Sequence, residues 1–451
     1  MAEGIDTMVE TVKYNNRHEL RFLWERRFKE LKSFTNETYI FSKRIIFTAD
    51  PENIKALLAS QFNDFGKGED FRLQWHPFLG DSIFATDGKQ WQESRHLIRP
   101  QFIKDRVSDL HTFERHFQLM LPHLPAAGQT FEVSNLLYRL TLDTATDFLL
   151  GSSVDSLTNP KAQFATSFAY IQAHMNHIMQ LGPLWKLYQV PAFKRHLAVL
   201  NNFVEPFVQR TLEMRPEDLK EKSETDYNFL HALAQYTRDP RMLRDQLVAV
   251  LLAARDTTAA QMSWGMHELS RRPDCVQRLR HEILQHVGPD KAPTYSDLKE
   301  MKYLQHVMNE ILRLYPGVPF NVRTALKDTT LPRGNVHDDS EPIGVLAGQR
   351  IAYSTLTMQR RKDLFGEDVN EFRPERWEEW QPKPWQYVPF NGGPRLCIGQ
   401  QFALTEMGYF WTRFFQKVER LENRSVGNQK EKCEIVLTTG EPVLVAVAMA
   451  E

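Results

Sequence analysis

Apolar and polar residues alternate along most of the chain at the spacing of amphipathic helices, and Pro/Gly clusters separate the helical stretches. The longest stretch covers residues 243–272 and stops at Pro273. Its roughly 30 residues would extend about 45 Å, so we expect a helix that crosses most of the molecule. Few stretches favour strands, which predicts a mainly α fold with minor β.

Two local patterns do predict β structure. Residues 44–48 (RIIFT) favour a short strand, and Asp50 with Pro51 behind it is typical of the start of a helix over residues 52–60. Near the C-terminus, residues 435–439 (IVLTT) and 443–447 (VLVAV) flank a Gly-Glu-Pro turn, which predicts a β-hairpin.

Length and charge add little to this pattern but exclude some classes of protein. The 451 residues show no Gly/Ser linker, low-complexity tract or repeat, so we expect a single domain over residues 1–451. A formal net charge of -1 gives no bulk attraction to nucleic acid. The first thirty or so residues lack the apolar run of ~18 to 20 that a bilayer span needs, so we expect no membrane anchor or signal peptide.

The cysteine and histidine content disfavours a zinc site. Cys275, Cys397 and Cys433 include no close pair, and they form no even-numbered disulfide framework. His174 and His177 could share a helix face, yet nothing nearby supplies a third ligand. The chain also has no Gly-rich nucleotide-binding loop, so electrons for any redox reaction must come from a separate reductase.

The strongest chemical signal is residues 390–399, FNGGPRLCIG, followed at once by a helical run over residues 400–407. A soft thiolate from Cys397 suits iron, and Gly392, Gly393 and Gly399 would let backbone N–H groups and a flat ligand approach the sulfur. The position before a helix N-terminus is expected to lower the pKa of the thiol, so that the ligand is anionic. This loop predicts an iron–thiolate site.

The five fixed positions of F-x-x-G-x-R-x-C-x-G resemble the haem-binding signature of the cytochrome P-450 superfamily. The resemblance spans about residues 38–451, with residues 1–37 poorly matched, and the FNGGPR and GQQFAL segments are similar to the fungal clade that hydroxylates alkanes and fatty acids. It implies a long central helix over the haem and the thiolate loop before a C-terminal helix. It also implies haem b with Cys397 as axial ligand and Phe390 and Gly399 in the haem loop.

The same resemblance implies the co-substrate and the partners. O2 would be the co-substrate, and NADPH would supply electrons through an NADPH-cytochrome reductase. The substrate would be lipophilic, and we expect terminal or near-terminal hydroxylation of a long-chain alkane or fatty acid.

Further segments match family elements that surround the haem. Trp91 and Arg95 form a W-x-x-x-R helix pattern, in which the indole offers one donor and the guanidinium a fork suited to a haem propionate. The resemblance gives Arg323 and Arg395 the same role. It also implies that Glu310, Arg313 and Arg376 form a buried network that supports the thiolate loop.

Polar residues interrupt the long apolar helix at residues 255–258. By resemblance, Thr257 opens the helix locally over the haem, and with Asp256 it supplies protons during oxygen activation. The alternative is that Thr257 and Thr258 bond back to carbonyls four residues earlier while Asp256 faces water. Ala254 departs from the family, which usually has glycine there, so the groove for oxygen is expected to be narrower.

The resemblance also assigns a substrate pocket, lined by Ile83, Phe84, Ala253, Phe320 and Val322. Residues 164–197 are rich in Phe, Met and Trp. We expect them to form either a lid over the access path or an amphipathic helix pair packed on the core.

Two alternative functions remain open at this stage. One is an isomerase or peroxygenase that needs no reductase, and the other is a non-catalytic haem-binding product of a truncated gene. By resemblance the protein would lie on the cytosolic face of the endoplasmic reticulum. Without an anchor we expect it to be soluble or in peripheral contact with the membrane.

Overall fold

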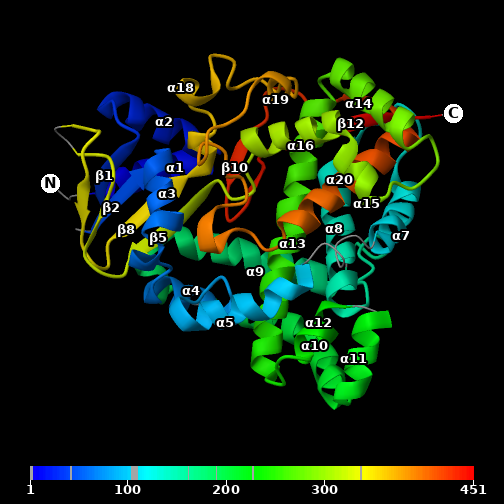
Figure 1. Cartoon of the computed structure of the whole chain (residues 1–451), viewed down its shortest axis with the longest axis horizontal. Coiled ribbons are helices and arrows are strands. Elements are labelled where there is room, and N and C mark those ends of the chain that lie inside the picture. The colour runs from blue at the N-terminus through cyan, green and yellow to red at the C-terminus, as the bar shows by residue number, and fades with distance from the viewer. Residues whose placement is uncertain are drawn as a thin grey trace.

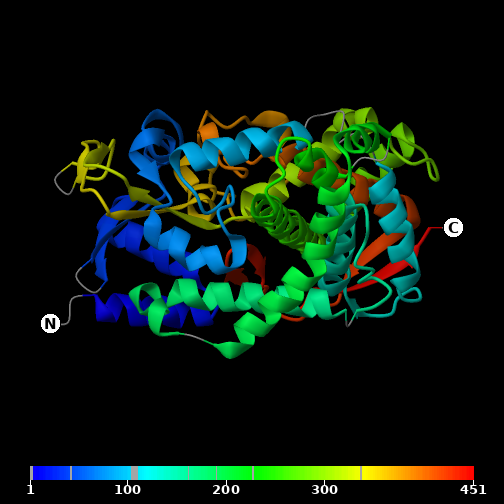
Figure 2. The same ribbon diagram turned by 90° about the horizontal axis from the view of Figure 1, so that it is seen from below.

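The computed structural model describes residues 4–40, 43–102, 110–160, 162–188, 190–225, 228–335 and 338–450. The described chain is mainly helical with minor β structure, so the predicted fold class is confirmed. Figure 1 shows the main sheet and the N-terminal helices at one end of the molecule, with most of the later helices at the other. Figure 2 shows the same division from below.

Helix α13 (Pro240–Leu269) is the long helix that the sequence predicts. It begins three residues earlier than expected because Pro240 occupies its first turn and the Asp239 carboxylate accepts a hydrogen bond from the N–H of Arg241. The helix ends at Leu269, and Pro273 begins the next one. Helices α4, α8, α10, α16 and α20 pack around it, so side chains on α13 reach the centre of the molecule.

The remaining helices surround α13 or cover the sheet. They are α1 (Ile5–Asn16), α2 (Leu20–Leu31), α3 (Pro51–Lys55), α4 (Glu69–Leu79), α5 (Gly88–Ile98), α7 (His111–Met120), α8 (Val133–Leu150), α9 (Gln163–Gln180), α10 (Pro191–Glu213), α11 (Pro216–Thr225), α12 (Phe229–Ala234), α14 (Pro273–His286), α15 (Tyr295–Glu300), α16 (Lys302–Leu314), α17 (Thr355–Met358), α18 (Lys362–Phe365), α19 (Arg376–Glu379) and α20 (Gln400–Lys417). In the described part of the chain, no helix combines the length and the apolar composition needed to cross a bilayer.

The main sheet has five strands in the order β1-β2-β8-β5-β3. These strands are β1 (Thr35–Ile40), β2 (Lys43–Thr48), β8 (Arg350–Ser354), β5 (Phe320–Ala325) and β3 (Phe65–Gly66). β2 and β8 are parallel and the other pairs are antiparallel. Strand β6 (Thr329–Leu331) pairs with β7 (Ile343–Val345) in a separate ribbon.

The predicted strand and helix near residue 50 are confirmed as β2 and α3. The carboxylate of Asp50 accepts hydrogen bonds from the N–H groups of Glu52 and Asn53, so it caps the helix as expected. The last turn differs, because Ala56–Ser60 is π-helical rather than α-helical.

The prediction that residues 435–439 and 443–447 pair as a C-terminal hairpin is wrong. β11 (Leu437–Thr439) pairs with β10 (Glu431–Cys433), whereas β12 (Leu444–Met449) pairs with β4 (Phe131–Glu132) and β9 (Val418–Asn423). The Gly-Glu-Pro turn therefore connects two different sheets. Short strands of this kind take the partner that covers their apolar face, and that partner lies far away in the sequence.

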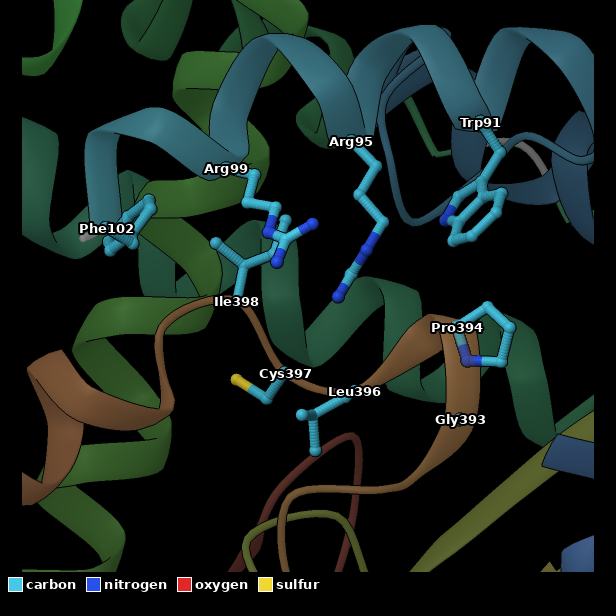
Figure 3. A pocket seen from close by; sticks show the side chains of 9 residues that line it. All are labelled: Trp91, Arg95, Arg99, Phe102, Gly393, Pro394, Leu396, Cys397 and Ile398. Atoms are coloured by element: carbon cyan, nitrogen blue, oxygen red, sulfur yellow. The ribbon is translucent and has the colours of Figure 1, made fainter. Parts of the chain in front are cut away.

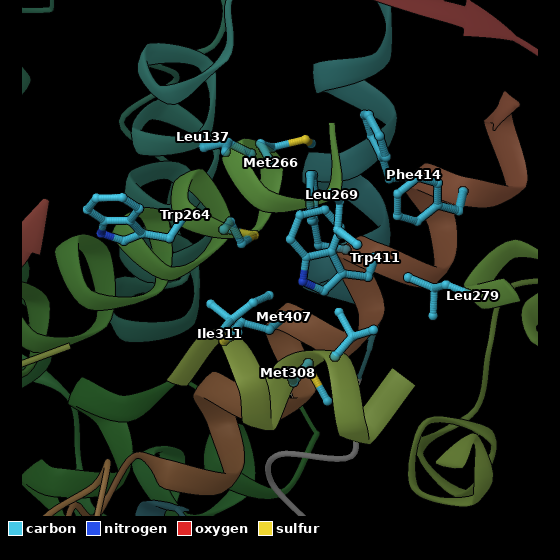
Figure 4. Packing of buried hydrophobic residues seen from close by; sticks show 14 of the residues in the cluster. Leu137, Trp264, Met266, Leu269, Leu279, Met308, Ile311, Met407, Trp411 and Phe414 are labelled. Carbon is cyan, nitrogen blue, oxygen red and sulfur yellow. The ribbon is translucent and has the colours of Figure 1, made fainter. Parts of the chain in front are cut away.

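The largest apolar cluster lies where α13, α16 and α20 cross, and Figure 4 shows Trp264, Ile311 and Trp411 within it. Gly265 faces Trp411 there, and a Cβ at this position would clash with the indole ring and with Ile311. Glycine therefore lets α13 approach α20 closely. Since α20 directly follows the thiolate loop, this contact fixes the loop relative to α13.

Candidate functional site

A cavity of about 420 Å³ lies between α5 and the segment that precedes α20. Figure 3 shows the side chains around it. Its lining residues are Trp91, Arg95, Arg99, Phe102, Gly393, Pro394, Leu396, Cys397 and Ile398. The volume is within the ~300 to 1,000 Å³ of typical small-molecule sites. Trp91 and Arg95 therefore meet Cys397 at one cavity, as their motifs predict.

Cys397 is held by the backbone of its own loop. Its N–H donates to the carbonyl of Phe390 at 3.0 Å, and the N–H of Gly399 donates to its sulfur. The thiol keeps accessible surface because it opens into the cavity, yet protein atoms surround that cavity and burial raises the pKa of Cys397. The predicted direction is therefore wrong, because the N–H of Gly399 and the charge of Arg95 lower the pKa by less than burial raises it.

Glycine is found in the loop for two different reasons. A Cβ at Gly392 would lie 2.5 Å from the ring of Trp385, and a Cβ at Gly393, whose φ is +62°, would clash with the carbonyl of Leu58. Close packing of the protein, rather than access to the sulfur, therefore requires glycine at these two positions. Gly399 has no neighbour within 4 Å of such a Cβ, which fits the predicted approach of a flat ligand.

The α5 wall of the cavity is positively charged. Arg95 and Arg99 lie one helical turn apart and both face the cavity (Figure 3). No carboxylate of the described residues forms an ion pair with either guanidinium. Burial and the charge of Arg99 lower the pKa of Arg95. An anionic ligand in the cavity would offset this unfavourable charge.

Arg395 and Arg323 lie beside the cavity rather than in its lining. Arg395 forms an ion pair with Asp87 at 2.6 Å, and its guanidinium is 4.7 Å from the centre of the Trp91 ring. Burial and the nearby charge of Arg323 lower the pKa of Arg395 to about 10. Arg323 donates to Asn321 and to the carbonyl of Val322. Asp87 has no motif of its own, so the sequence did not indicate this ion pair.

These residues fit the haem that the family resemblance implies. A thiol with an N–H group directed at its sulfur is suited to hold iron. Arg95 and Arg99 supply positive charge without a protein carboxylate, and the buried Nε of Arg395 has no hydrogen-bond partner among the described residues. Both observations point to an anionic group at this edge of the cavity.

The predicted network of Glu310, Arg313 and Arg376 is present. Arg313 donates two hydrogen bonds to Glu310, at 2.8 and 2.9 Å, and Arg376 approaches the same carboxylate at 3.5 Å. The indole of Trp377 also donates to Glu310, at 3.0 Å, which motif matching did not indicate. Three side chains therefore converge on the carboxylate of Glu310, which is closed to solvent.

This network extends to the chain just before the thiolate loop. Arg313 donates to the carbonyl of Gln359, whose side-chain oxygen accepts a hydrogen bond from the N–H of Val388. Val388 lies two residues before Phe390, the first residue of the loop. The network therefore anchors the start of the loop, as predicted.

Asp256 and Thr257 match neither sequence interpretation in full. The hydroxyl of Thr257 donates to the carbonyl of Ala253 at 2.7 Å within an uninterrupted helix, so the expected local opening is not present. Asp256 does not face water, because it is buried against Arg255 at 2.9 Å and also accepts a hydrogen bond from Gln172 of α9. Burial raises the pKa of the Asp256 carboxyl.

A second buried acid lies next to this segment. Both side-chain oxygens of Glu406 on α20 and the hydroxyl of Thr258 on α13 form no hydrogen bond of standard geometry among the described residues, although the two side chains are neighbours. Burial raises the pKa of Glu406 to about 8, and the neighbouring Thr258 opposes that shift. The sequence offered one signal for this buried acid. Glu406 interrupts an apolar helical run, and burying a charged group there is unfavourable unless it is paired or neutral.

The five predicted pocket residues do not line the cavity that contains Cys397. Ile83 is buried, Phe84 is 40% exposed, and Ala253 accepts the hydrogen bond from Thr257. The ring centre of Phe320 lies 6.4 Å from that of Trp24 in α2. Gly317, which no motif indicated, lies beside Thr257, since a Cβ on this glycine would be 3.6 Å from the Thr257 side chain.

The predicted lid corresponds to α9, a 3-10 turn (Gly182–Leu187) and the start of α10. Phe164, Phe168 and Met175 of α9 are buried in the core, so this helix packs on the body of the protein. Leu187, at the end of the turn, is 83% exposed. The ring of His174 stacks on Phe193 at 4.2 Å, which gives this histidine a packing role.

Comparison with known proteins agrees with the geometry. A family model described as cytochrome P-450 matches residues 11–445, so the match begins earlier than the sequence motifs indicated. Cytochrome P-450 monooxygenase pvhE of Talaromyces variabilis is 49% identical over an alignment of 441 residues, which covers 92% of this chain and 82% of that protein. Cytochrome P-450 52A13 of Debaryomyces hansenii is 42% identical over 88% of this chain and 79% of its own length. Cytochrome P-450 52A1 of Candida tropicalis is 40% identical over 92% and 80%, respectively.

Proposed function

Because the chain belongs to the cytochrome P-450 family of monooxygenases, which act on lipophilic substrates, we propose that it hydroxylates a long-chain alkane or fatty acid at or near its end. One oxygen atom of O2 would enter a C–H bond of the substrate. The observation that carries the proposal is the thiol of Cys397, which opens into a cavity and accepts a hydrogen bond from the N–H of Gly399. Trp91 and Arg95 close the same cavity from α5.

Haem, when bound, would supply oxygen activation and electron transfer. Cys397 would bind its iron, and Trp91 and Arg95 would bind a propionate with support from Arg323 and Arg395. The family uses a separate reductase, and we propose that NADPH is the ultimate electron donor. The Glu310 network would hold the loop of Cys397 in place during turnover.

Proton supply would rest on Asp256 and Thr257. Burial favours the protonated form of Asp256, so this group can hold a proton inside the protein. Thr257 lies one residue further along the same helix, with its hydroxyl proton on the carbonyl of Ala253. Rotation of the hydroxyl away from that carbonyl would let Thr257 donate a hydrogen bond into the active site.

The substrate class is supported by apolar side chains on one strand. Phe320 and Val322 alternate with Asn321 and Arg323 along β5, so the two apolar residues share a face. Burying each methylene is favourable by ~0.8 kcal/mol, so an apolar channel can bind a long chain without many polar contacts. Terminal attack also needs walls that keep the inner carbons away from the reacting centre. We propose that Phe320 and Val322, which do not line the cavity of Cys397 itself, form such walls beside it.

We further propose that residues 1–451 form one haem domain in peripheral contact with the cytosolic face of the endoplasmic reticulum. The exposed Leu187 and the partly exposed Tyr188, between α9 and α10, supply an apolar surface for such contact. Washing membranes with alkaline carbonate should release the protein.

The test of this function uses the purified haem protein with a NADPH-dependent reductase. Fatty acids and alkanes should shift the spin state of the haem and give terminal or near-terminal alcohols, and Val322→Ala should move hydroxylation inward along the chain. Rigid aromatic or steroid substrates that give both the shift and the product, while aliphatic chains give neither, would refute the substrate class. Turnover with peroxide alone would favour a peroxygenase instead.

A further inference from the structure

Three cationic side chains converge where the main sheet meets the thiolate loop. Lys67 follows β3, Arg323 lies in β5, and Arg395 precedes Cys397 by two residues. β3 pairs with β5 through Gly66 and Thr324, which brings Lys67 next to Arg323. Lys67 Nζ and Arg323 Nη1 both donate to the side-chain oxygen of Asn321, at 3.1 and 3.2 Å.

The three cations share one carboxylate. Among the described residues, ion pairs of these side chains are limited to Arg395 with Asp87. Burial and the charges of Arg323 and Arg395 lower the pKa of Lys67 well below its usual value. Two positive charges therefore lack a counter-charge in a partly closed site, which is unfavourable unless a ligand supplies it.

The backbone around Lys67 holds it in place without neutralising it. Asp87 accepts hydrogen bonds from the N–H groups of Lys67 and Gly68, at 2.8 to 2.9 Å. Gly68 has φ +79°, and a Cβ there would lie 2.9 Å from the hydroxyl of Thr324. The backbone of this segment is thus fixed against β5, and the hydrogen bond from Nζ to Asn321 orients the Lys67 side chain.

The cluster adjoins the cavity of Cys397. Arg395 stacks on Trp91, which lines that cavity, and the charge of Arg95 acts on Arg395. Haem b carries two propionates, and the uncompensated charges of this cluster, together with those of Arg95 and Arg99 at the cavity, supply the cations to bind both. Building on the proposed function, we infer that Lys67 binds a haem propionate together with Arg323, with Asn321 positioning both cations.

Haem retention provides the test, because it can be measured without turnover. Transfer of haem from the holoenzyme to excess apomyoglobin should be about ten-fold faster or more for Lys67→Met, as expected for loss of one charge-assisted hydrogen bond. Lys67→Arg should restore slow release. Lys55→Met, which removes an exposed lysine of α3, is the matched control and should release haem like the parent.

Haem dimethyl ester separates ligand binding from a structural role. Its blocked carboxylates cannot pair with Lys67, so parent and Lys67→Met should release it at equal rates. If Lys67→Met accelerates the release of haem and of the ester by the same factor, Lys67 is structural and the inference is wrong. Weaker binding of a fatty acid with unchanged haem release would assign the cation to the substrate carboxylate and also overturn it.

A second variant covers the case in which Lys67→Met does not fold. Asn321→Asp places a carboxylate within reach of Lys67 and Arg323, so it should compete with the propionate and accelerate haem release. Unchanged release would contradict the inference.

For every variant, the thiolate-type Soret band of the reduced carbon monoxide complex reports the proposed function separately, because it depends on Cys397. Failure of the parent to bind haem would overturn both proposals.

Discussion

Glu310 and Arg313 form two hydrogen bonds, of 2.8 and 2.9 Å, in a site closed to solvent. Glu310→Ala would leave Arg313 as a buried charge with no counter-charge from this carboxylate, and breaking such a pair costs ~3 to 5 kcal/mol. We expect a large fall in soluble haem protein and in the urea midpoint of unfolding.

The chain offers a matched control for this prediction. Arg215 and Asp218 have the same i, i+3 spacing at 2.9 Å, but both side chains are exposed. Asp218→Ala should lower the urea midpoint far less than Glu310→Ala, because water solvates Arg215 when its partner is lost. Equal losses in the two variants would show that burial does not set the importance of the Glu310 pair.

Elements with strong local signals could be predicted from the sequence. The length and apolar spacing of α13 specify a helix whatever surrounds it, and Asp50 with Pro51 specifies the start of α3. The partners of β11 and β12 could not be predicted in the same way. Each strand is short, and the choice between β10 and β9 depends on contacts with distant residues.

The residues of the candidate site also fall into those that motifs predicted and those that only the fold brings together. Motif spacing brought Trp91 and Cys397 together correctly, because each lies at a fixed place in a family element. Asp87 and Lys67 belong to no motif, and their importance comes from contacts with residues far away in the chain. The pKa of Cys397 was predicted in the wrong direction because a helix terminus is visible in the sequence, whereas burial becomes visible in the fold.

The next prediction concerns the metal ligand. Cys397→Ala should abolish the red-shifted Soret band of the reduced carbon monoxide complex, because no other cysteine reaches the cavity. Cys275→Ala and Cys433→Ala should preserve the band, since both thiols are buried elsewhere. Absorbance spectra of the three variants provide the measurement, and a thiolate-type band in Cys397→Ala would refute the assignment.

Removal of the Thr257 hydroxyl should affect proton supply but not binding. Thr257→Ala should keep haem and substrate affinity, while product formed per NADPH falls by about ten-fold, because a positioned proton donor contributes up to ~10² to 10⁴ in rate. Peroxide should account for the missing electrons. Thr258→Ala is the control on the same helix, and a larger loss of product in that variant would move the role to Thr258.

Glu406 should make the stability of the protein depend on pH in a way that one substitution can remove. Its folded-state pKa is raised to about 8 from an ordinary value of 4.5. Between these values the unfolded chain has lost the proton while the folded chain keeps it, so folding is favoured at low pH and the free energy of unfolding falls as pH rises. Linkage gives a slope of about 1.4 kcal/mol per pH unit for one such group.

Two buried histidines act in the opposite direction at lower pH. His116 and His267 have pKa values lowered to about 4 by burial, so they make the free energy of unfolding rise with pH below their ordinary value of 6.5.

The window from pH 6.5 to 8 therefore isolates the carboxyl from the two histidines. In that window Glu406→Gln should flatten the pH dependence of the urea midpoint relative to the parent, since the amide stays neutral in both states. Glu419→Gln, on the exposed start of β9 just beyond α20, changes the same charge in solvent and should leave the slope of the parent unaltered. An unchanged slope in Glu406→Gln would mean that Glu406 is ionised in the folded protein, and that a counter-charge or water satisfies its carboxylate.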